Sequence, residues 1–181
     1  EFIKKYPNPV SFNSSMIKLE LGQELPPQSL RKKLSSLGYV STEVTETRGE
    51  FSSRGDILDV FLQGEDNPVR IEFFGDEIDA IRHYDPDTQR SIDNCDSIEI
   101  TPGSLFLPKN EQIYDALEKI KINGFFEDSI EKISELFETK NSPRIFEEFI
   151  DCFDIETAKI WDYLGTDGVV VICEPEKLKN R

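Results

Sequence analysis

The sequence predicts an α+β fold, in which a curled antiparallel sheet packs against one helix and is followed by a helical segment and a single strand. Across residues 39–101, apolar and polar side chains alternate with a period of two, and turn-forming residues interrupt the alternation. The turns are too short to hold crossover helices, so neighbouring strands are expected to be antiparallel. After Gly103, apolar residues recur every three or four positions, which is the spacing of one helical face.

One strand and one helix are expected before the sheet. Apolar and charged residues alternate from Ile17 to Leu21, as in a half-buried strand. A helix is expected over residues 27–37, because Pro27 suits a first helical turn and leucines follow at helical spacing. Gly38 is a typical residue just beyond a helix C-terminus.

The sheet is expected to contain five strands, each rich in β-branched, aliphatic or aromatic residues. They cover residues 39–47, 57–61, 69–74, 77–84 and 98–100. Glycine, proline, asparagine and aspartate lie between most of them, and these residues favour turns. We therefore expect a domain over residues 26–103, in which the helix covers one face of the sheet.

The remaining sequence is expected to be mainly helical. Helical stripes of apolar residues occur at residues 113–120 and 130–137, and shorter apolar clusters occur at residues 146–153 and 160–164. Residues 169–173 form a continuous apolar run, which is typical of a strand buried on both faces of a parallel sheet.

Three parts follow from this pattern. Residues 1–25 are expected to be a connecting segment with one strand, and residues 104–181 a helical segment that ends with the buried strand. No partner for that strand is obvious in the sequence, and the chain opens at Glu1 rather than at methionine. We therefore expect this chain to be a piece of a larger protein whose other part completes the strand's sheet.

The composition argues against several classes of function. The chain carries 21 basic and 36 acidic residues, a net charge of −15, which disfavours binding to nucleic acid or to an anionic membrane. Three separated cysteines without a CxxC pair indicate neither a zinc site nor a disulfide framework, and they suit a reducing cytoplasm. No apolar run approaches the ~20 residues of a membrane span. Tight turns and few exposed apolar runs favour a monomer.

Residues that could support catalysis are sparse. His83 is the single histidine, and it lies within an expected strand, where an ordinary structural position is favoured. The sequence contains neither the GxxxxGK(S/T) loop nor the GxGxxG fingerprint, which both bind phosphate groups, so we expect no nucleotide in this chain. We also expect no metal cofactor. The many paired carboxylates fall on turns and helix surfaces, where a solvated face is the simpler interpretation. We expect a chain that is not itself an enzyme.

The most informative stretch contains Phe73 and Phe74. Adjacent residues of a strand point to opposite faces, so one phenylalanine can enter the core while the other faces solvent or a partner. Arg54 and Arg70 belong to the same stretch, and an exposed aromatic residue flanked by arginine is typical of a protein interface. From the residues alone, the alternative stays open that the outward-facing phenylalanine is an ordinary residue of the sheet with no partner.

Several motifs run in order through and around this stretch. They are Leu37-Gly38-Tyr39, Arg48-Gly49-Glu50-Phe51, the residues from Arg54 to Phe61, those from Pro68 to Ile78, and those from Asp85 to Ser91. Together they resemble the module shared by the repair protein UvrB and the bacterial transcription-repair coupling factors (Mfd), and the last motif favours the coupling factors. The resemblance is strongest over residues 17–103. Asp56 and Leu62 depart from the common pattern at loop edges.

The resemblance implies both a fold and a partner. It implies a UvrB domain 2-like fold, with residues 104–181 returning to a helicase-like α/β half-domain. It also implies that the module binds the repair protein UvrA through two arginines, an aromatic residue and an acid. The corresponding positions here are Arg54, Arg70, Phe74 and Asp76.

The family implies further partners for the larger protein. Coupling factors displace RNA polymerase stalled at a DNA lesion by ATP-driven translocation, and they recruit UvrA for nucleotide excision repair in the bacterial cytoplasm. Sites for ATP, Mg²⁺, DNA and the polymerase are therefore expected in domains outside this chain. A C-terminal domain of the parent protein is expected to cover the UvrA-binding face until a conformational change.

Three alternatives stay open on the sequence. The corresponding region of UvrB would also bind UvrA. A DNA-binding module would suit a family that handles DNA, although the net charge of −15 disfavours it. A small hydrolase that depends on paired carboxylates is the third alternative, and metal binding would reveal it.

Overall fold

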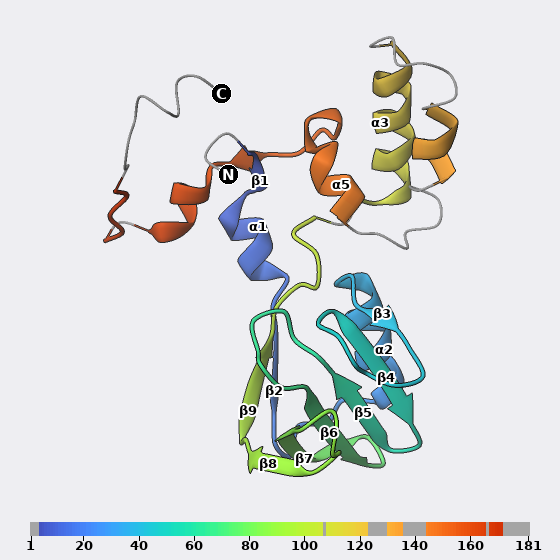
Figure 1. Cartoon of the computed structure of the whole chain (residues 1–181), viewed down its shortest axis with the longest axis vertical. Helices are drawn as coiled ribbons and strands as arrows, with labels where there is room; N and C mark the ends of the chain where they lie inside the picture. Colours follow the sequence, from blue (N-terminus) through green and yellow to red (C-terminus); the bar gives the residue numbers. More distant parts are fainter. Residues whose placement is uncertain (1–3, 107, 123–129, 136–143, 166, 172–181) are drawn as a thin grey trace.

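The computed structural model describes residues 4–106, 108–122, 130–135, 144–165 and 167–171, and Figure 1 labels its elements. The first elements are β1 (Tyr6–Pro7), α1 (Pro9–Ser14), β2 (Ile17–Glu20), α2 (Pro27–Ser36) and β3 (Val40–Ser41). Next come β4 (Glu50–Arg54), β5 (Ile57–Val60), β6 (Val69–Phe74), β7 (Glu77–Tyr84), β8 (Ser91–Asn94) and β9 (Ser97–Ile100). The last are α3 (Asn110–Ile122), α5 (Arg144–Glu148), β10 (Thr157–Ala158) and the 3₁₀ helices η1 (Ile150–Cys152) and η2 (Ile160–Leu164).

A six-stranded sheet dominates the lower part of the molecule (Figure 1). Its strand order is β3-β4-β5-β6-β7-β8, and all neighbours from β4 to β8 are antiparallel. The strand β3 runs parallel to β4. The predicted α+β fold with a curled, mainly antiparallel sheet is confirmed. The ladder of backbone hydrogen bonds fixes which side chains share a face.

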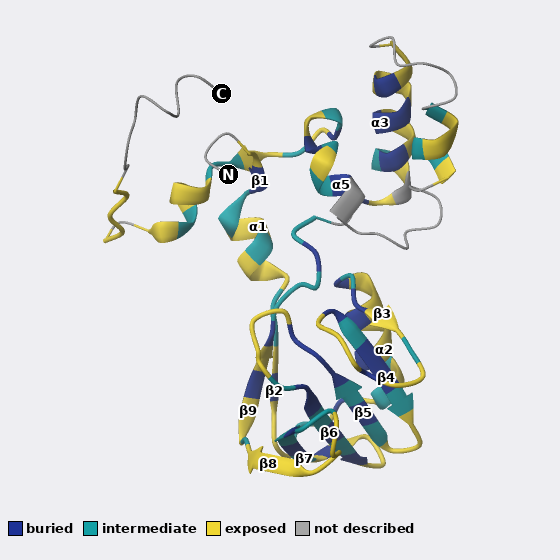
Figure 2. Cartoon of the chain, in the orientation of Figure 1, coloured by how far each residue is buried: buried dark blue, intermediate teal, exposed yellow. Residues whose placement is uncertain are grey.

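The inner face of the sheet and the helix α2 enclose the main hydrophobic core (Figure 2). The predicted helix after Pro26 is confirmed, and its Leu30 and Leu34 are fully buried. Other fully buried members of this core are Leu19, Leu58, Val60, Val69, Ile71, Ile78 and Ile100. Burial of each such side chain stabilises the fold by ~1.5–3 kcal/mol. The outer face of the sheet therefore stands on a well-packed support.

A second, smaller core lies in the upper part of the molecule (Figure 2). The helix α3 buries Ile113 and Ile120 in a cluster with Phe146 and Phe153. The two phenylalanine rings meet edge to face, with centroids 6.1 Å apart. This geometry is the favourable one for aromatic pairs.

The helices predicted after residue 103 are confirmed where the structure describes them. The apolar stripe predicted at residues 113–120 lies in α3. Of the stripe predicted at residues 130–137, residues 130–135 are helical, and residues 136–137 lie outside the described residues. The cluster at 146–153 forms α5 and η1, and the one at 160–164 forms η2. None of the described helices is long and apolar enough to span a membrane.

The strand predicted over residues 39–47 is wrong for most of its length. Only Val40 and Ser41 are in a strand, and a loop follows. The Glu50 carboxylate holds this loop, because it accepts hydrogen bonds from the backbone N–H groups of Glu46 and Thr47 at 3.0 and 2.9 Å. Burial acts to raise the pKa of Glu50, but these hydrogen bonds outweigh it and hold that pKa below its ordinary value.

Two strands of the six-stranded sheet escaped the sequence analysis, as did the short pair β1–β10, and the last strand predicted for the sheet pairs differently from expectation. The strand β4 is rich in serine, and β8 is exposed along its whole length, so neither shows apolar alternation. The predicted strand at 98–100 forms β9, but it pairs with β2, with Ile17 opposite Ile100, instead of extending the large sheet.

The segment before α2 shares the core of the sheet. Leu19 of β2 and Leu25 are both buried in the main cluster. Leu19 and Leu25 thus pack with the sheet. The division of the chain into three parts, with boundaries at residues 26 and 104, stays a prediction.

The strand predicted at residues 169–173 is absent from its described part. Residues 169–171 have no strand structure, and Val169 and Val171 are 82% and 74% exposed. A strand requires a hydrogen-bonded neighbour, and none of the described residues pairs with this segment. Residues 172–173 lie outside the described residues.

Candidate functional site

A row of polar residues crosses the outer face of the six-stranded sheet. Strand register aligns Ser52 of β4 with Asp59 of β5, and Asp59 with Arg70 of β6. Arg82 of β7 continues the row beside Arg70. Directly opposite residues of antiparallel strands have Cβ atoms about 4.5–5.5 Å apart, so their side chains interact. The backbone ladder therefore builds this row.

Arg70 forms the centre of the row. Its Nε and Nη2 atoms donate to the two carboxylate oxygens of Asp59, both at 2.8 Å, and the two side chains are only 19% and 13% exposed. Nη2 also donates to Oε1 of Gln89 at 2.8 Å, and the guanidinium lies 4.4 Å from the centre of the Tyr84 ring. The hydrogen bonds with Asp59 raise the pKa of Arg70, and burial raises the pKa of the Tyr84 phenol.

A pocket of about 430 Å³ opens beside this ion pair. Its lining residues are Glu43, Val44, Ser52, Arg54, Ile57, Asp59, Arg70 and Gln89. Two guanidinium groups, two carboxylates and two aliphatic side chains meet there. This mixture suits a peptide segment with charged and apolar side chains, because complementary charges give orientation and specificity.

Phe73 and Phe74 occupy opposite environments, which confirms the expectation for this pair. Phe73 is 6% exposed in the core, whereas Phe74 is 81% exposed. The pairing of β6 with β7 shifts register between Glu72 and Phe73. Gly75 then turns the chain with a φ of 64°, a conformation that glycine adopts without a steric penalty. Phe74 is thus presented to solvent on a short, hydrogen-bonded turn.

The β4–β5 turn lies at the same end of the sheet as the β6–β7 turn. The backbone N–H of Phe73 donates to the carbonyl of Asp56 at 2.8 Å, which joins the two turns. Arg54, at the end of β4, and Asp76, in the second turn, are both exposed. These two charged side chains and the exposed phenylalanine therefore share one end of the sheet.

The four residues predicted to contact a partner fall into two groups. Arg54 and Arg70 line one pocket, whereas Phe74 and Asp76 lie at the β6–β7 turn. The geometry of Arg70 differs from the expectation, because two of its nitrogen atoms hold Asp59 instead of being free for a partner's carboxylate. The contact roles of all four residues stay a prediction.

Sequence reasoning missed the residues that hold Arg70. Asp59, Tyr84 and Gln89 meet it only through strand register and the β7–β8 turn, and no local pattern encodes that meeting. One weak signal was available for Asp59, which alternates with the buried apolar residues of β5 and so belongs on the outer face. Gln89 has a φ of 60°, which is uncommon for a residue other than glycine.

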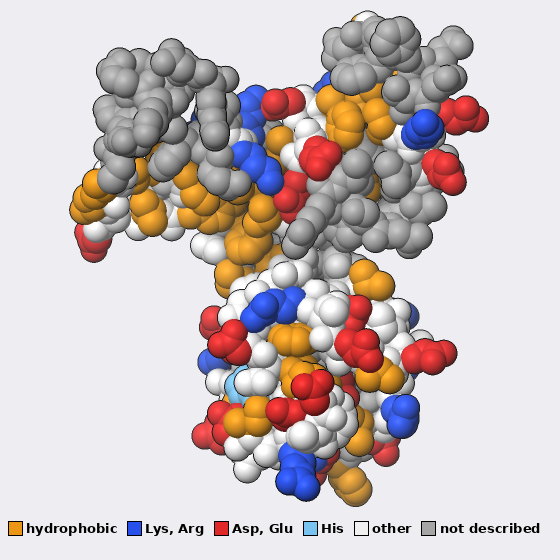
Figure 3. Space-filling view, in the orientation of Figure 1, with side chains coloured by type: hydrophobic (Ala, Val, Ile, Leu, Met, Phe, Trp, Pro, Cys, Tyr) orange, Lys and Arg blue, Asp and Glu red, His pale blue; other side chains and the backbone are white. Residues whose placement is uncertain are grey.

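Charges of both signs are mixed on the face of the molecule that Figure 3 shows. Basic and acidic side chains are interspersed over the sheet part, and that face carries no broad basic area. Affinity for nucleic acid rests on clustered lysine and arginine. The face shown and the net charge of −15 both favour a protein partner over DNA.

Comparison with known proteins places part of this sequence in a family. Residues 17–106, which include α2 and the whole six-stranded sheet, match the family described as UvrB interaction domain. The transcription-repair-coupling factor of Staphylococcus aureus strain MRSA252 is 34% identical over an alignment 195 residues long. That alignment covers 98% of this chain and 16% of that protein. The corresponding factor of Bacillus subtilis strain 168 is 38% identical over 109 residues, which cover 60% of this chain and 9% of that protein.

The chain thus spans less than a fifth of the length of the curated relatives that it matches. The match agrees with the motifs seen in the sequence, and its limits enclose the sheet, its helix and the β2–β9 pair. Residues 17–106 therefore belong to the UvrB interaction domain family, within a chain whose sequence resembles a segment of the transcription-repair-coupling factors.

Proposed function

We propose that this chain is a non-catalytic docking module of a transcription-repair-coupling factor and that its partner is UvrA. The observation that carries the proposal is Phe74, the last residue of β6, which is 81% exposed and pairs with Glu77 beside the β6–β7 turn. An anchor side chain that is already positioned loses little conformational entropy on binding. The match to the UvrB interaction domain family supports a protein partner for this part of the chain.

The charged residues around Phe74 complete the proposed face. Arg54 and Asp76 are exposed and opposite in charge, so they can pair with an acid and a base of the partner. Exposed charges of this kind set the orientation and the rate of association more than the affinity. Phe74 is expected to provide most of the affinity, ~2–4 kcal/mol, by entering an apolar pocket of UvrA.

Arg70 has a different part in this face. Because it is paired with Asp59 and both side chains line the pocket, we propose that Arg70 shapes the pocket and offers its remaining surface to the partner. A partner carboxylate that approaches Arg70 would have to share the guanidinium with Asp59. The energetic effect of removing Arg70 is therefore expected to combine binding and folding.

The proposed role of this module depends on the larger coupling factor to which it would belong. The relatives are named for the coupling of transcription to repair. We propose that the module recruits UvrA to RNA polymerase stalled at a lesion. ATP, Mg²⁺, DNA and the polymerase are then bound by other parts of the protein, and a C-terminal domain covers the face around Phe74 until docking.

Isothermal titration of the 181-residue chain with UvrA tests this proposal. The wild-type chain is expected to bind with micromolar or tighter affinity, and Phe74→Ala is expected to weaken binding by about 30- to several-hundred-fold. The control is Tyr114→Ala, which removes another exposed aromatic side chain, 68% exposed on α3, and should leave affinity unchanged.

Two outcomes would reject the proposal. A folded wild-type chain that does not bind UvrA would remove the partner. A folded Phe74→Ala variant that binds as tightly as the wild type would show that the docking face lies elsewhere.

A further inference from the structure

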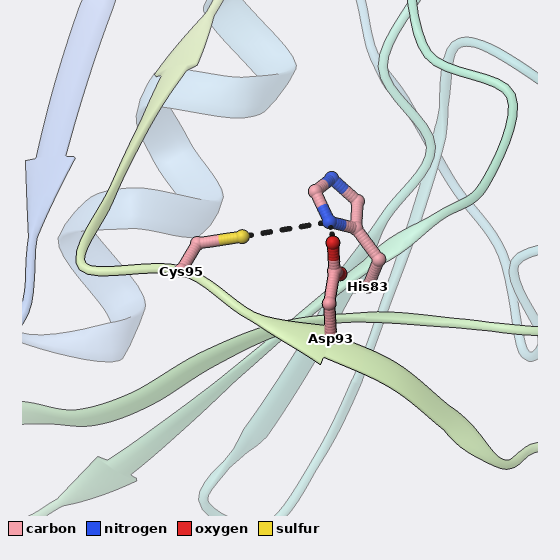
Figure 4. Close-up of side chains that lie close together, drawn as sticks. All are labelled: His83, Asp93 and Cys95. Carbon is pink, nitrogen blue, oxygen red and sulfur yellow. Dashed lines mark hydrogen bonds and ion pairs between the residues drawn. The ribbon is translucent and has the colours of Figure 1, made fainter.

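His83, Asp93 and Cys95 meet at the end of β7 opposite to the turn that carries Phe74 (Figure 4). Nδ1 of His83 lies 2.7 Å from Oδ1 of Asp93 and 3.4 Å from Sγ of Cys95. All three donor atoms lie within 4.8 Å of one another. Within the described ranges, no other group of histidine, cysteine and acidic side chains meets this spacing.

The backbone places these three groups. His83 and Asp93 are register partners in β7 and β8. Cys95 follows β8, and its backbone N–H donates to the carbonyl of Ile81 at 2.9 Å. No local sequence pattern indicates this cluster, because the pairing of β7 with β8 creates the proximity.

The histidine ring is oriented toward the other two side chains. Its Nδ1 atom faces both the carboxylate and the sulfur in Figure 4, while Nε2 is buried without a hydrogen-bond partner among the described residues. The side chain of His83 is 21% exposed and that of Asp93 is 61% exposed. A small ion can therefore reach the cluster from the side of the carboxylate.

We propose that His83, Asp93 and Cys95 form a binding site for a zinc-type divalent ion, with water as the fourth ligand. Imidazole nitrogen, carboxylate oxygen and thiolate sulfur are the ligands that zinc takes in proteins. Zinc–ligand bonds of about 2.0–2.3 Å at tetrahedral angles place neighbouring ligand atoms about 3.5 Å apart. The 3.4 Å separation of Nδ1 and Sγ already fits this geometry.

Only the carboxylate has to move. Its 2.7 Å contact with Nδ1 is hydrogen-bonding distance, and metal binding would lengthen it by less than about 1 Å. The exposure of Asp93 on the edge strand β8 permits that shift. The bound ion would then tie β8 to β7 and to the turn that precedes β9.

The surrounding charges also favour a cation. The negative charges of Asp93, Glu65 and Asp96 act on the Cys95 side chain. The same charges attract a divalent ion. On binding, the ion replaces the thiol proton, which passes to solvent, and a sulfur–metal bond forms.

Titration of the 181-residue chain with Co²⁺, which substitutes for Zn²⁺ and absorbs light strongly when bound by a thiolate, tests the site. The starting variant is Cys152→Ser with Cys173→Ser, which leaves Cys95 as the single thiol. It is expected to bind one Co²⁺ per chain with thiolate absorption, and Zn²⁺ should displace the cobalt. Adding Cys95→Ser should abolish the absorption and weaken Zn²⁺ binding by more than about tenfold.

The matched control is Asp96→Asn in the same background, which removes a nearby negative charge but no proposed ligand and should keep the absorption. Asp93→Asn tests the site at an exposed position, where the fold is not at risk, and should weaken Zn²⁺ binding. Thermal unfolding without metal checks that each variant folds. No thiolate absorption at millimolar Co²⁺, or absorption that survives Cys95→Ser, would overturn the proposal, whatever the result with UvrA.

Discussion

Two consecutive residues of β6 show how one strand serves both stability and recognition. The strand sends Phe73 into the core and leaves Phe74 in water. An exposed phenylalanine adds little to the stability of the isolated chain, and the free energy of burying it becomes available when a partner covers it. The same residue type is therefore expected to respond differently to mutation at these two positions.

Alanine substitution of the two phenylalanines provides a direct comparison. Phe73→Ala is expected to lower the free energy of unfolding by about 3–5 kcal/mol, because it leaves a cavity in the core. Phe74→Ala is expected to change it by no more than about 0.5 kcal/mol, since the ring is 81% exposed. Urea denaturation followed by circular dichroism measures both values. Equal losses would mean that Phe74 packs against the fold.

The ion pair between Arg70 and Asp59 is expected to stabilise the fold. Arg70→Ala is expected to lower the free energy of unfolding by about 2–3 kcal/mol, because it leaves the Asp59 carboxylate mostly buried and without its bidentate partner. Arg54→Ala, at an exposed position, should cost no more than about 0.5 kcal/mol.

A double-mutant cycle with Asp59→Ala isolates the contribution of this pair. The loss in the double variant is expected to be clearly smaller than the sum of the two single losses. Additive losses would mean that the two side chains act independently and that Arg70 is free to serve a partner.

At the scale of elements, the β6–β7 turn fixes the position of Phe74 and Asp76. Gly75→Ala is expected to destabilise the chain by about 1 kcal/mol, because its φ of 64° is costly for a residue with a Cβ atom. UvrA affinity should fall as well, since the turn carries the proposed anchor. The control is Gly64→Ala, whose new Cβ atom would have nothing within 4 Å. Denaturation and titration of both variants make the comparison, and equal effects would reject a special role for the β6–β7 turn.

Elements whose apolar residues follow a regular period could be predicted from the sequence, and elements without such a period could not. The strands β5, β6 and β7 and the helix α2 were found because their apolar residues follow one period and face one core. The β-branched residues of the loop after β3 predict a strand, but the backbone N–H groups of Glu46 and Thr47 donate to the Glu50 carboxylate and not to a neighbouring strand. The exposed edge strand β8 carries no apolar signal at all.

Long-range pairing limited the prediction of the site as well. Phe74 was identified because adjacent residues of a strand must point to opposite faces. The partners of Arg70 and the cluster around His83 come together only when several strands are in register. The pairing of Ile17 with Ile100 depends in the same way on contacts between distant segments.

At the scale of the whole molecule, the functions that we propose are spatially separate. The docking face lies at the end of the sheet where β6 turns into β7, and the proposed metal site lies at the other end of β7. The smaller core around α3 shares no residue with the core of the sheet. Binding of UvrA is therefore expected to protect one end of the sheet and to leave α3 unaffected.

Amide hydrogen exchange of the chain, alone and bound to UvrA, shows which part of the surface the partner covers. Exchange in the bound chain is expected to slow at residues 54–57 and 74–77, the two turns that share one end of the sheet. Exchange in α3 should not change. Protection in α3 without protection of the two turns, or no protection anywhere on the sheet, would contradict the assignment of this face to docking.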